Sequence, residues 1–434
     1  MGRIMNRYAL MIRNLKTAPV MDRLTCLYGN RDGMLVQQIA RYTAMLKRHE
    51  ETFRTDSPVY MISAPGRTEI GGNHTDHNKG CVLAAAVNLD TLAAVSARDD
   101  LVVNVHSESY PAMTLDLSDL TMRPEEQGTT AALIRGCANR MKELGYRIGG
   151  FDACITSSVA SGSGLSSSAA FEVLVVAILD KLYNGFVIDY KTRAVISQYA
   201  ENVYFGKPSG LLDQMASSAG GLVNVDFRQE DPEVHPMNYD FAAHGYALVV
   251  TATGGSHADL TDDYAAIPAE MKAVAAHFDQ PYLRRVRWEE IMQALPQLRG
   301  KVSDRALLRA RHFFEENKRV GIQVQALKED RLEDFLQAII ESGRSSYMYL
   351  QNVYARPTDQ SLSLALMLAE YMLAGKGAWR IHGGGFAGTT LNFVPRAELP
   401  AFVAMMESAF GEHCCHVLDI RPEGAAVLDL NSDN

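Results

Sequence analysis

The stretch SSVASGSGLSSSAAFEVLVVAILDKL, residues 157–182, joins a loop rich in glycine and serine to a long helical run. The glycines of this loop let backbone N–H groups converge without hindrance from Cβ atoms, and the start of the helix adds unpaired N–H groups and the positive end of its dipole. Together they predict an anion site, and the usual anion is phosphate. The stretch has neither the Gly-Lys-Ser/Thr of a Walker A loop nor a G-x-G-x-x-G fingerprint. A plain turn before a buried helix is the alternative, and this stretch alone does not separate the two.

The composition is that of an ordinary globular protein. The chain has 434 residues, of which 47% are hydrophobic and 21% are charged, and its formal net charge is −9. This length predicts two or three domains with ample core. The acidic balance argues against a nucleic-acid partner, and a phosphate site in such a chain must be locally positive or hold a metal. No apolar run approaches the roughly 20 residues that a membrane span needs, so we expect no membrane partner.

The cysteines indicate a reducing compartment. The six of them form no C-x-x-C pair, and we interpret them as reduced thiols of a cytoplasmic protein. The basic start, residues 1–16, is compatible with a transit peptide, but an amphipathic helix is favoured, and there is no secretory signal pattern. The sequence leaves the oligomeric state open, and a monomer is compatible with it.

The residue pattern divides the chain into three parts. Residues 1–57 are predicted to be a helical extension packed on the main domain, because apolar residues recur there at helical spacing. An N-terminal domain is expected over residues 58–235 and a C-terminal domain over residues 236–434. The break between them is placed in an acidic, turn-rich stretch at residues 228–240.

Residues 64–80, APGRTEIGGNHTDHNKG, are dense in glycine and polar side chains, and we expect a loop or a pair of turns there. His74, Asp76 and His77 could form a metal cluster, but they lack the helical H-E-x-x-H pattern. The glycines around them indicate that a ligand approaches the backbone, and a carboxylate with amides suits the hydroxyls of a sugar. A surface loop with solvated polar groups is the alternative.

Two later stretches carry further candidates. Asp213 is the single acid in SGLLDQMA, residues 209–216, and is either a helix cap, the commoner fate of such a residue, or a functional carboxylate. The triple glycine at residues 383–385 lies between two strand-like segments and permits a backbone path that side chains would block. A wide hairpin loop is the alternative for these glycines.

Four segments, in their order along the chain, make this sequence similar to the galactokinase branch of the GHMP small-molecule kinases. Residues 64–80 resemble the galactokinase signature, and SGSGLSSSAAFE at residues 161–172 resembles the phosphate loop of the superfamily. GLLDQMAS at residues 210–217 resembles the segment that bears the catalytic aspartate, and GGGFAG at residues 383–388 resembles the third, C-terminal glycine motif. The resemblance covers most of the chain but not the N-terminal extension.

This resemblance implies an α+β architecture, the two-domain GHMP kinase fold. The N-terminal domain would be like the second domain of ribosomal protein S5, the C-terminal domain would be a ferredoxin-like sandwich, and the active site would lie in the cleft between them. The implied reaction is phosphoryl transfer from ATP to the 1-hydroxyl of galactose, with Mg²⁺ as the metal ion.

The resemblance also implies a role for each matched residue. Asp213 would be the carboxylate beside the anomeric hydroxyl, as base or orienter, and Arg67 would hold it ionised and stabilise the transferring phosphoryl group. The residues expected to contact the sugar are Asn73, His74, Asp76 and Tyr264. The residues expected to cradle the nucleotide phosphates are Gly162, Ser163, Gly164, Leu165, Ser166, Ser167 and Ser168, with Gly383, Gly384 and Gly385 closing from the other domain. Magnesium would be held by Ser168 and Glu172.

The sugar side departs from the family pattern. This chain has Glu69 where galactokinases have Asn, and Asn73 where they have the Glu expected to bind the outer hydroxyls of the sugar. The exchange predicts the loss of a full negative charge from the pocket, so galacturonate becomes an alternative substrate, because the missing carboxylate would have repelled it. A non-catalytic sugar sensor ranks lower, since Arg67, Asp213 and the serines at 166–168 are all present.

Overall fold

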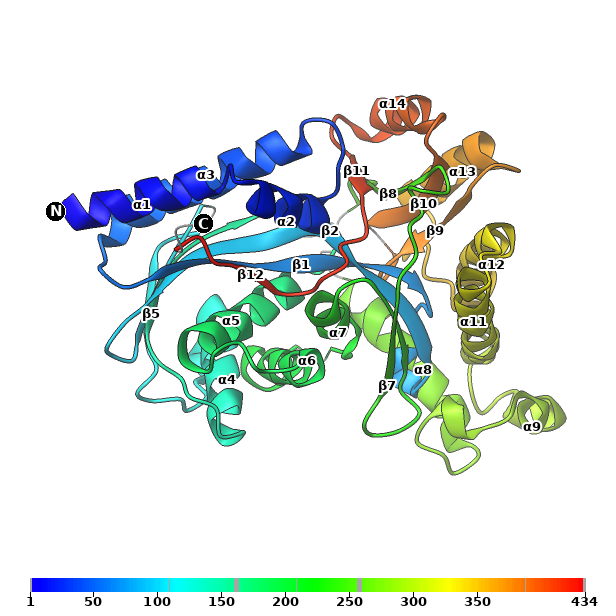
Figure 1. Cartoon of the computed structure of the whole chain (residues 1–434). Coiled ribbons are helices and arrows are strands. Elements are labelled where there is room, and N and C mark those ends of the chain that lie inside the picture. Colours follow the sequence, from blue (N-terminus) through cyan, green and yellow to red (C-terminus); the bar gives the residue numbers. More distant parts are fainter. Residues whose placement is uncertain are drawn as a thin grey trace.

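The computed structural model describes residues 2–108, 110–159, 164–207, 209–255, 260–386 and 388–431. Two β-sheets stand side by side, and helices cover each of them (Figure 1). Two long antiparallel strands, β1 (Val59–Gly71) and β2 (Cys81–Ala97), run through the first sheet. Their far ends pack in one hydrophobic core with the second sheet. The mixed α+β architecture expected from the sequence is therefore present.

The first sheet is built around the β1–β2 pair. Its strand order is β12-β1-β2-β5-β3-β4, and in addition β6 pairs with β2 and β7 with β6. Of these pairings only β3 with β5 is parallel. The remaining strands are β3 (Val102–Ser107), β4 (Met113–Asp116), β5 (Phe151–Ser157), β6 (Leu222–Asp226), β7 (Glu233–Met237) and β12 (Ala426–Leu428).

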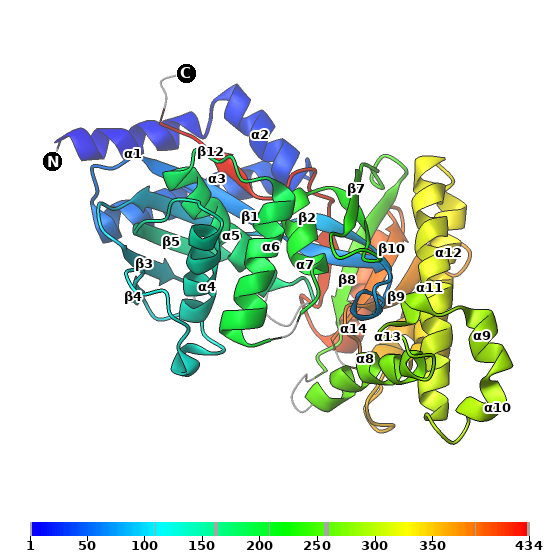
Figure 2. The same ribbon diagram turned by 90° about the horizontal axis from the view of Figure 1, so that it is seen from below.

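Helices cover both faces of the first sheet, because alternate residues of its strands are apolar on each side. Ile62, Ala93 and Val95 face the helix α5, while Met61 and Ala94 face the N-terminal helices. Figure 2, seen from below, shows in front of the sheet the helical layer that lies under it in Figure 1. That layer contains α4 (Thr130–Glu143), α5 (Ser167–Tyr183), α6 (Tyr190–Tyr199), the π-helical turn Ala200–Phe205 and α7 (Leu212–Ala219); the upper layer contains α1 (Gly2–Asn14), α2 (Ala18–Tyr28) and α3 (Met34–Phe53).

The second sheet is antiparallel, in the order β11-β8-β10-β9. One face packs on α11 and α12 together with the ends of β1 and β2, and the other face packs on α13 and α14. Its strands are β8 (Tyr246–Ala252), β9 (Ala378–His382), β10 (Thr389–Pro395) and β11 (Cys415–Leu418), and its helices are α8 (Thr261–Ala276), α9 (Trp288–Gln293), α10 (Leu295–Leu298), α11 (Asp304–Lys328), α12 (Leu332–Ser345), α13 (Ser361–Leu373) and α14 (Leu399–Phe410). Within the described ranges, no helix has the length and apolar character needed to span a bilayer.

The prediction of a loop over residues 64–80 is wrong for its first half. Residues 64–71 continue strand β1 and are buried, and only residues 72–80 turn back toward β2. The density of glycine misled the prediction, because one of these glycines serves close packing rather than a turn. A Cβ atom on Gly66 would lie 2.8 Å from the carbonyl oxygen of Leu165, so only glycine lets the strand approach the glycine-serine loop this closely.

The two sheets do not divide the chain at a single point. The boundary expected near residue 235 falls within β7, which belongs to the first sheet. Strand β12 returns from the far end of the chain and pairs with β1, with Met61 opposite Leu428. The division into two domains near residue 235 therefore stays a prediction. Residues 426–428 are an exception to it, because they belong to the sheet of the first half.

A buried charged network joins the N-terminal extension to the first sheet. Asp90 on β2 accepts hydrogen bonds from Tyr28 of α2 at 2.6 Å, Arg41 of α3 at 2.6 Å and Arg421 at 3.2 Å. Burial alone would raise the pKa of Asp90, but the two guanidinium groups outweigh it and hold this pKa below its usual value. The backbone carbonyl of Asp90 accepts a 2.9 Å bond from the N–H of Ser158, just before the glycine-serine loop. The extension thus supports the strand beside that loop.

Replacing Asp90 with Asn should destabilise the protein by about 3–5 kcal/mol, because Arg41 and Arg421 would stay buried without an anionic partner. Urea unfolding at neutral pH measures the loss. The matched control is Asp100→Asn, which removes the exposed partner of Arg98 and should change the free energy of unfolding far less. Equal losses in the two variants would contradict a supporting role for the Asp90 network.

Candidate active site

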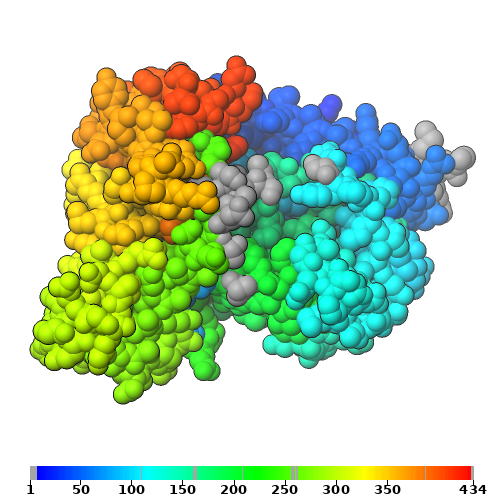
Figure 3. Space-filling view, turned by 180° about the vertical axis from the view of Figure 1, so that it is seen from behind, coloured from blue at the N-terminus to red at the C-terminus, as the bar shows by residue number. Residues whose placement is uncertain are grey.

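A cavity of about 260 Å³ lies between the two halves of the molecule. Figure 3 shows the surface hollowed between the lobe that carries α4–α6, in cyan to green, and the lobe that carries α8–α12, in yellow-green to yellow. Both halves contribute to the lining. The residues that matter below are Glu69, His74, Asp76, Lys207 and Asp213 from the first half, and Gly383 and Gly384 from the second.

Asp213 and Arg67 form a bidentate ion pair at the wall of this cavity. Arg67 Nε lies 2.6 Å from Asp213 Oδ1, and Arg67 Nη2 lies 2.7 Å from Oδ2. The hydroxyl of Ser166 donates a further 2.7 Å hydrogen bond to Oδ2. Arg67 Nη1 donates to the carbonyl oxygen of Gly164, so one guanidinium group joins the carboxylate to the glycine-serine loop. Asp213 lies in the first turn of α7 but does not cap it, which removes the alternative of a plain helix cap.

The ion pair keeps Asp213 charged. Burial alone would raise the pKa of its carboxyl group, but the charge of Arg67 and the hydrogen bonds from Arg67 and Ser166 outweigh burial and hold this pKa below its usual value. A carboxylate that is ionised, oriented by three donors and still 28% exposed can accept a proton or a hydrogen bond from a bound ligand.

The described part of the glycine-serine loop, residues 164–166, is fixed to its neighbours through close main-chain contacts. Gly162 and Ser163 lie outside the described residues. Gly164 has φ of +73°, and a Cβ atom there would lie 2.6 Å from Thr389 Oγ1, so the loop depends on glycine at this point. Leu165 is fully buried, and its carbonyl oxygen accepts a 2.9 Å bond from the N–H of Arg67. Leu165 therefore anchors the loop to β1 through the main chain.

No side chain among the described residues accepts a hydrogen bond from the first-turn N–H groups of α5. Ser166 precedes the helix with φ of 59° and makes no capping bond, because its hydroxyl is directed to Asp213. Ser167 and Ser168 begin the helix. N–H groups at the positive end of this 17-residue helix have the geometry and partial charge that suit an anion, so the anion site stays a prediction here. The geometry brings this site next to the ionised carboxylate.

The triple glycine is a packed turn held by residues of both halves, rather than a free hairpin loop. The carbonyl oxygen of Gly384 lies 2.9 Å from His74 Nε2, and the carbonyl oxygen of Gly385 accepts a 2.8 Å bond from the hydroxyl of Tyr264. A Cβ atom on Gly385 would lie 2.1 Å from the carbonyl oxygen of Asn352. Backbone and side chains approach this closely only because glycine occupies the position.

The residues expected to contact a sugar divide into two groups. His74 and Asp76 line the cavity, whereas Tyr264 and Asn73 do not. Tyr264 instead donates its hydroxyl hydrogen bond to the glycine turn, at the carbonyl oxygen of Gly385. Burial lowers the pKa of His74 to about 4, so its ring is neutral and Nε2 donates to Gly384. No group of three or more potential His, Cys, Asp or Glu metal ligands gathers in the described part of the chain, and His74 and Asp76 form none.

The predicted loss of negative charge from the pocket is wrong, because Glu69 supplies a carboxylate. Glu69 lines the cavity, and its Oε1 accepts bonds from Asn73 Nδ2 and Arg380 Nη2, each at 2.8 Å. Asn73 is fully buried and also donates to the carbonyl oxygen of Gly383 at 2.7 Å. The exchange in the sequence therefore moves the carboxylate by four residues and does not remove it. The charge argument for galacturonate is lost with it.

Ser168 and Glu172 lie on one face of α5, but they do not share a partner. The hydroxyl of Ser168 donates to Glu201 Oε1 at 3.1 Å, and Glu172 Oε2 accepts from Gln214 Nε2 at 2.9 Å. Glu172 Oε1 is buried and has no hydrogen-bond partner among the described residues. Burial and the neighbouring Glu201 raise the pKa of Glu172 well above its usual value. An orphaned buried carboxylate oxygen fits a cation, so these residues are compatible with a magnesium ion.

Sequence reasoning missed several residues that hold the site together. Arg380 and His382 on β9 are buried and bond to β1, the ring of His382 accepting a 3.2 Å bond from the N–H of Glu69. Lys207 lies 2.9 Å from Glu201. The available signal was position, since Arg380 and His382 immediately precede the triple glycine and Lys207 precedes Asp213 by six residues.

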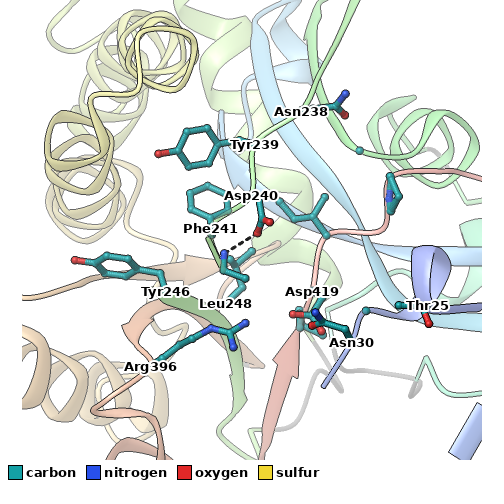
Figure 4. Close-up of a pocket in the computed structure, with 16 residues that line it drawn as sticks. Thr25, Asn30, Asn238, Tyr239, Asp240, Phe241, Tyr246, Leu248, Arg396 and Asp419 are labelled. Carbon is teal, nitrogen blue, oxygen red and sulfur yellow. Dashed lines mark hydrogen bonds between the residues drawn. The ribbon is translucent and has the colours of Figure 1, made fainter. Parts of the chain in front are cut away.

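A larger cavity of about 510 Å³ lies elsewhere, between the end of α2 and the edge of the second sheet (Figure 4). None of the expected site residues that the structure describes lines it. Its two acids already have partners, since Asp240 accepts the N–H groups of Ala242 and Ala243, and Asp419 pairs with Arg31 at 2.8 Å. The smaller cavity at Asp213 therefore remains the candidate active site.

Two family models and two curated relatives that match this chain all describe galactokinases or GHMP kinases. Residues 47–97 match the galactokinase galactose-binding signature, and residues 132–221 match the GHMP kinases N terminal domain. A galactokinase of Streptomyces coelicolor is 32% identical over 356 residues, which cover 81% of this chain and 89% of that protein. A galactokinase of Exiguobacterium sibiricum is 30% identical over 361 residues, which cover 82% and 89%.

Solved structures agree with this comparison. The crystal structure of Lactococcus lactis galactokinase complexed with galactose is similar with a TM-score of 0.77 and 25% sequence identity, and the match covers 89% of this chain and 99% of that chain. The mevalonate kinase of Methanococcus jannaschii is similar in fold alone, with a TM-score of 0.58 and 14% identity over 85% of this chain and 96% of that chain.

The two buried glutamates Glu172 and Glu316 should respond in opposite ways to replacement by Gln. The pKa of Glu172 is raised by burial, so its charge destabilises the metal-free fold above the unfolded-state pKa, and Glu172→Gln should leave unchanged or raise the free energy of unfolding at pH 7. His312, Arg319 and Arg380 overcome burial at Glu316 and lower its pKa to about 2, so Glu316→Gln should lose roughly 2–3 kcal/mol at pH 7.

Urea unfolding from pH 2 to pH 8 in the presence of a chelator measures both glutamate variants. The advantage of the Gln variant at position 172 should grow as the pH rises through the range in which the wild-type carboxyl group ionises. The deficit at position 316 should shrink as the pH falls toward 2. The same sign of change at pH 7 in both variants would refute the assigned environments.

Proposed function

Because this chain belongs to the galactokinase family of the GHMP kinases, we propose that it transfers the γ-phosphoryl group of ATP to the anomeric hydroxyl of galactose, giving galactose 1-phosphate and ADP. The observation that carries this proposal is the bidentate pair between Asp213 and Arg67, 2.7 Å from the hydroxyl of Ser166 at the start of α5. A charged carboxylate beside an anion site is what phosphoryl transfer to a hydroxyl requires.

Asp213 acts on the sugar hydroxyl in this proposal. The hydroxyl oxygen attacks the γ-phosphorus, the bond from that phosphorus to the bridging oxygen of ADP breaks, and the hydroxyl proton passes to the Asp213 carboxylate. The lowered pKa of Asp213 keeps it ionised and able to accept this hydrogen bond at neutral pH. Its three donors fix its direction, which contributes through positioning.

Arg67 and the start of α5 act on the phosphate side. The guanidinium group of Arg67 is nearly buried, so its charge is little screened by water and favours the negative charge of the transferring group. Main-chain N–H groups after Gly164 and Ser166 would receive the nucleotide phosphates, and the carbonyl-lined turn at Gly383–Gly385 would close the sugar side.

Magnesium belongs to the proposal as the cofactor of ATP. When bound, Mg²⁺ neutralises phosphate oxygens and helps to orient the nucleotide. Ser168 and Glu172 would hold it, supported by the unpartnered Oε1 of Glu172. Glu201 lies close enough to bond Ser168 and would share in this site.

The two alternatives rank lower. Galacturonate would bring a carboxylate to a cavity that Glu69, Asp76 and Asp213 already line. A sugar sensor without transfer would not need the aligned pair of Asp213 and Arg67. We also propose a cytoplasmic location, supported by six cysteines that are all free thiols.

Release of ADP that depends on galactose tests the function. Wild-type protein with Mg-ATP should form ADP with galactose and little with galacturonate, and Asp213→Asn should lower kcat by about 10³-fold or more while galactose binding by calorimetry persists. Binding of both ligands without ADP would favour the sensor, and turnover of galacturonate alone would favour the acidic sugar. Unchanged turnover in the Asn variant would remove Asp213 from its role.

Arg67→Lys should lower kcat about 100-fold and move the acid limb of the pH profile of kcat/KM upward by roughly one unit. The direction follows from the pKa of Asp213, which Arg67 holds below its usual value and which burial would raise once the bidentate pair is lost. A remote buried arginine, Arg135, which pairs with Glu126, provides the control as Arg135→Lys. A profile that keeps its acid limb would show that Arg67 does not control the ionisation of Asp213.

A further inference from the structure

Glu69 has one carboxylate oxygen held by the protein and one left over for a ligand. Oε1 accepts hydrogen bonds from Asn73 and from Arg380, each at 2.8 Å. Oε2 accepts no hydrogen bond from a described residue. It is also not one of the fully buried side-chain atoms that lack a partner, so it keeps some accessible surface. Because Glu69 is 8% exposed and lines the cavity with Asp213, that small exposed area faces the cavity.

Asn73 cannot serve the same purpose, because its amide is fully committed. It is 0% exposed and does not line the cavity. Its Nδ2 donates to Glu69 Oε1 and to the carbonyl oxygen of Gly383, and its Oδ1 accepts a 2.9 Å bond from Asn352. A carboxylate at position 73 would face two acceptors instead of donating to them. The amide at position 73 and the carboxylate at position 69 are therefore a matched pair.

Arg380 explains why a carboxylate is tolerated at position 69. Its guanidinium group is 0% exposed and lies on β9, in the other sheet, where it bonds Glu69 and the carbonyl oxygen of Ile70. Burial raises the pKa of Glu69, and the charges of Arg380 and Arg67 and the Asn73 bond oppose that rise. The pair also crosses between the sheets, so it fixes the position of Glu69 relative to the triple glycine.

The charges around the cavity indicate which ligand this carboxylate would accept. Of the described residues that line it, Glu69, Asp76 and Asp213 carry carboxylates, and only Lys207 carries an ammonium group. An additional carboxylate on the ligand would meet three carboxylates, although two of them are paired with arginines. A hydroxyl group would instead donate to the free oxygen of Glu69. The cavity is therefore built for a neutral, hydroxyl-rich ligand.

We propose that Glu69 is a specificity-determining residue, whose Oε2 accepts a hydrogen bond from a hydroxyl group of a neutral sugar, and that Asn73 is a positioning residue that aims it. This inference rests on the proposed sugar kinase function and adds the residue that recognises the sugar. It also identifies the exchange at positions 69 and 73 as a relocation of one carboxylate within the same site.

Glu69→Gln tests the proposal by a split between kinetic constants. The KM for galactose should rise about 10- to 100-fold, the range for a lost hydrogen bond to a charged group, while the KM for ATP stays within twofold. Glu126→Gln is the matched control, since it also removes the carboxylate partner of a buried arginine, Arg135, but lies away from the cavity. It should leave both KM values unchanged.

A series of monodeoxy galactoses gives a readout that a merely structural role would not move. For the sugar that lacks the contacted hydroxyl, the wild type should lose about the same factor in kcat/KM as Glu69→Gln loses with galactose, and the variant should lose little more. If no deoxy sugar shows this coupling, the proposal is overturned. If Glu69→Gln fails to fold by circular dichroism, Glu69→Asp keeps the charge and draws it back by one methylene, and the same series is run with it.

Different results would refute the sugar kinase activity and the role of Glu69. Absence of sugar-dependent ADP from the wild type refutes the proposed function. Normal turnover of galactose by the wild type, together with an unchanged KM for galactose in folded Glu69 variants, refutes the role of Glu69 alone. Preference of the wild type for galacturonate over galactose would also overturn it, because the cavity would then favour a charged sugar.

Discussion

The site depends on one guanidinium group that is shared between three segments. Arg67 lies on β1 and donates hydrogen bonds to both carboxylate oxygens of Asp213 at the start of α7. It also donates to the carbonyl oxygen of Gly164 in the glycine-serine loop. These segments are far apart along the chain. Strand β1 supplies the guanidinium group, α7 supplies the carboxylate, and the loop leads to the predicted anion site at the start of α5. Because Arg67 is buried, its charge also decides the protonation state of Asp213 against the opposing effect of burial.

A second set of contacts fixes the distance between the two halves. Arg380 and His382 from β9 bond to Glu69 and to the backbone of β1, and Asn73 and His74 hold the carbonyl oxygens of the triple glycine. Asn73, Arg380 and His382 are buried and hydrogen-bonded, so movement of one half against the other would leave polar groups without partners. These hydrogen bonds therefore fix the two halves together at the wall of the cavity that Glu69, Gly383 and Gly384 line.

The resemblance predicted which segments meet at the site better than the local sequence predicted their backbone. Asp213, Arg67 and the loop before α5 were brought together from separate segments by resemblance alone, and the geometry agrees. The strand over residues 64–71 was missed, since its glycines allow close packing against Leu165 and give the same local signal as a turn. The consequence of the Glu69 and Asn73 exchange was misjudged because sequence position does not reveal which side chain faces a cavity. Arg380 could not be predicted, since a buried ion pair between sheets depends on how the halves pack.

Strand β12 has a consequence for how the protein is made. Residues 426–428 pair with Met61, Ile62 and Ser63, more than 350 positions earlier, and Arg421 completes the environment of Asp90. During synthesis, nearly all of the preceding segments have emerged from the ribosome before this edge of the sheet is covered. Until then the growing polypeptide exposes an unpaired strand edge, which is the kind of surface that chaperones bind and that promotes aggregation. Premature termination shortly before residue 426 would leave that edge permanently open, even though every residue of the catalytic cavity would be present.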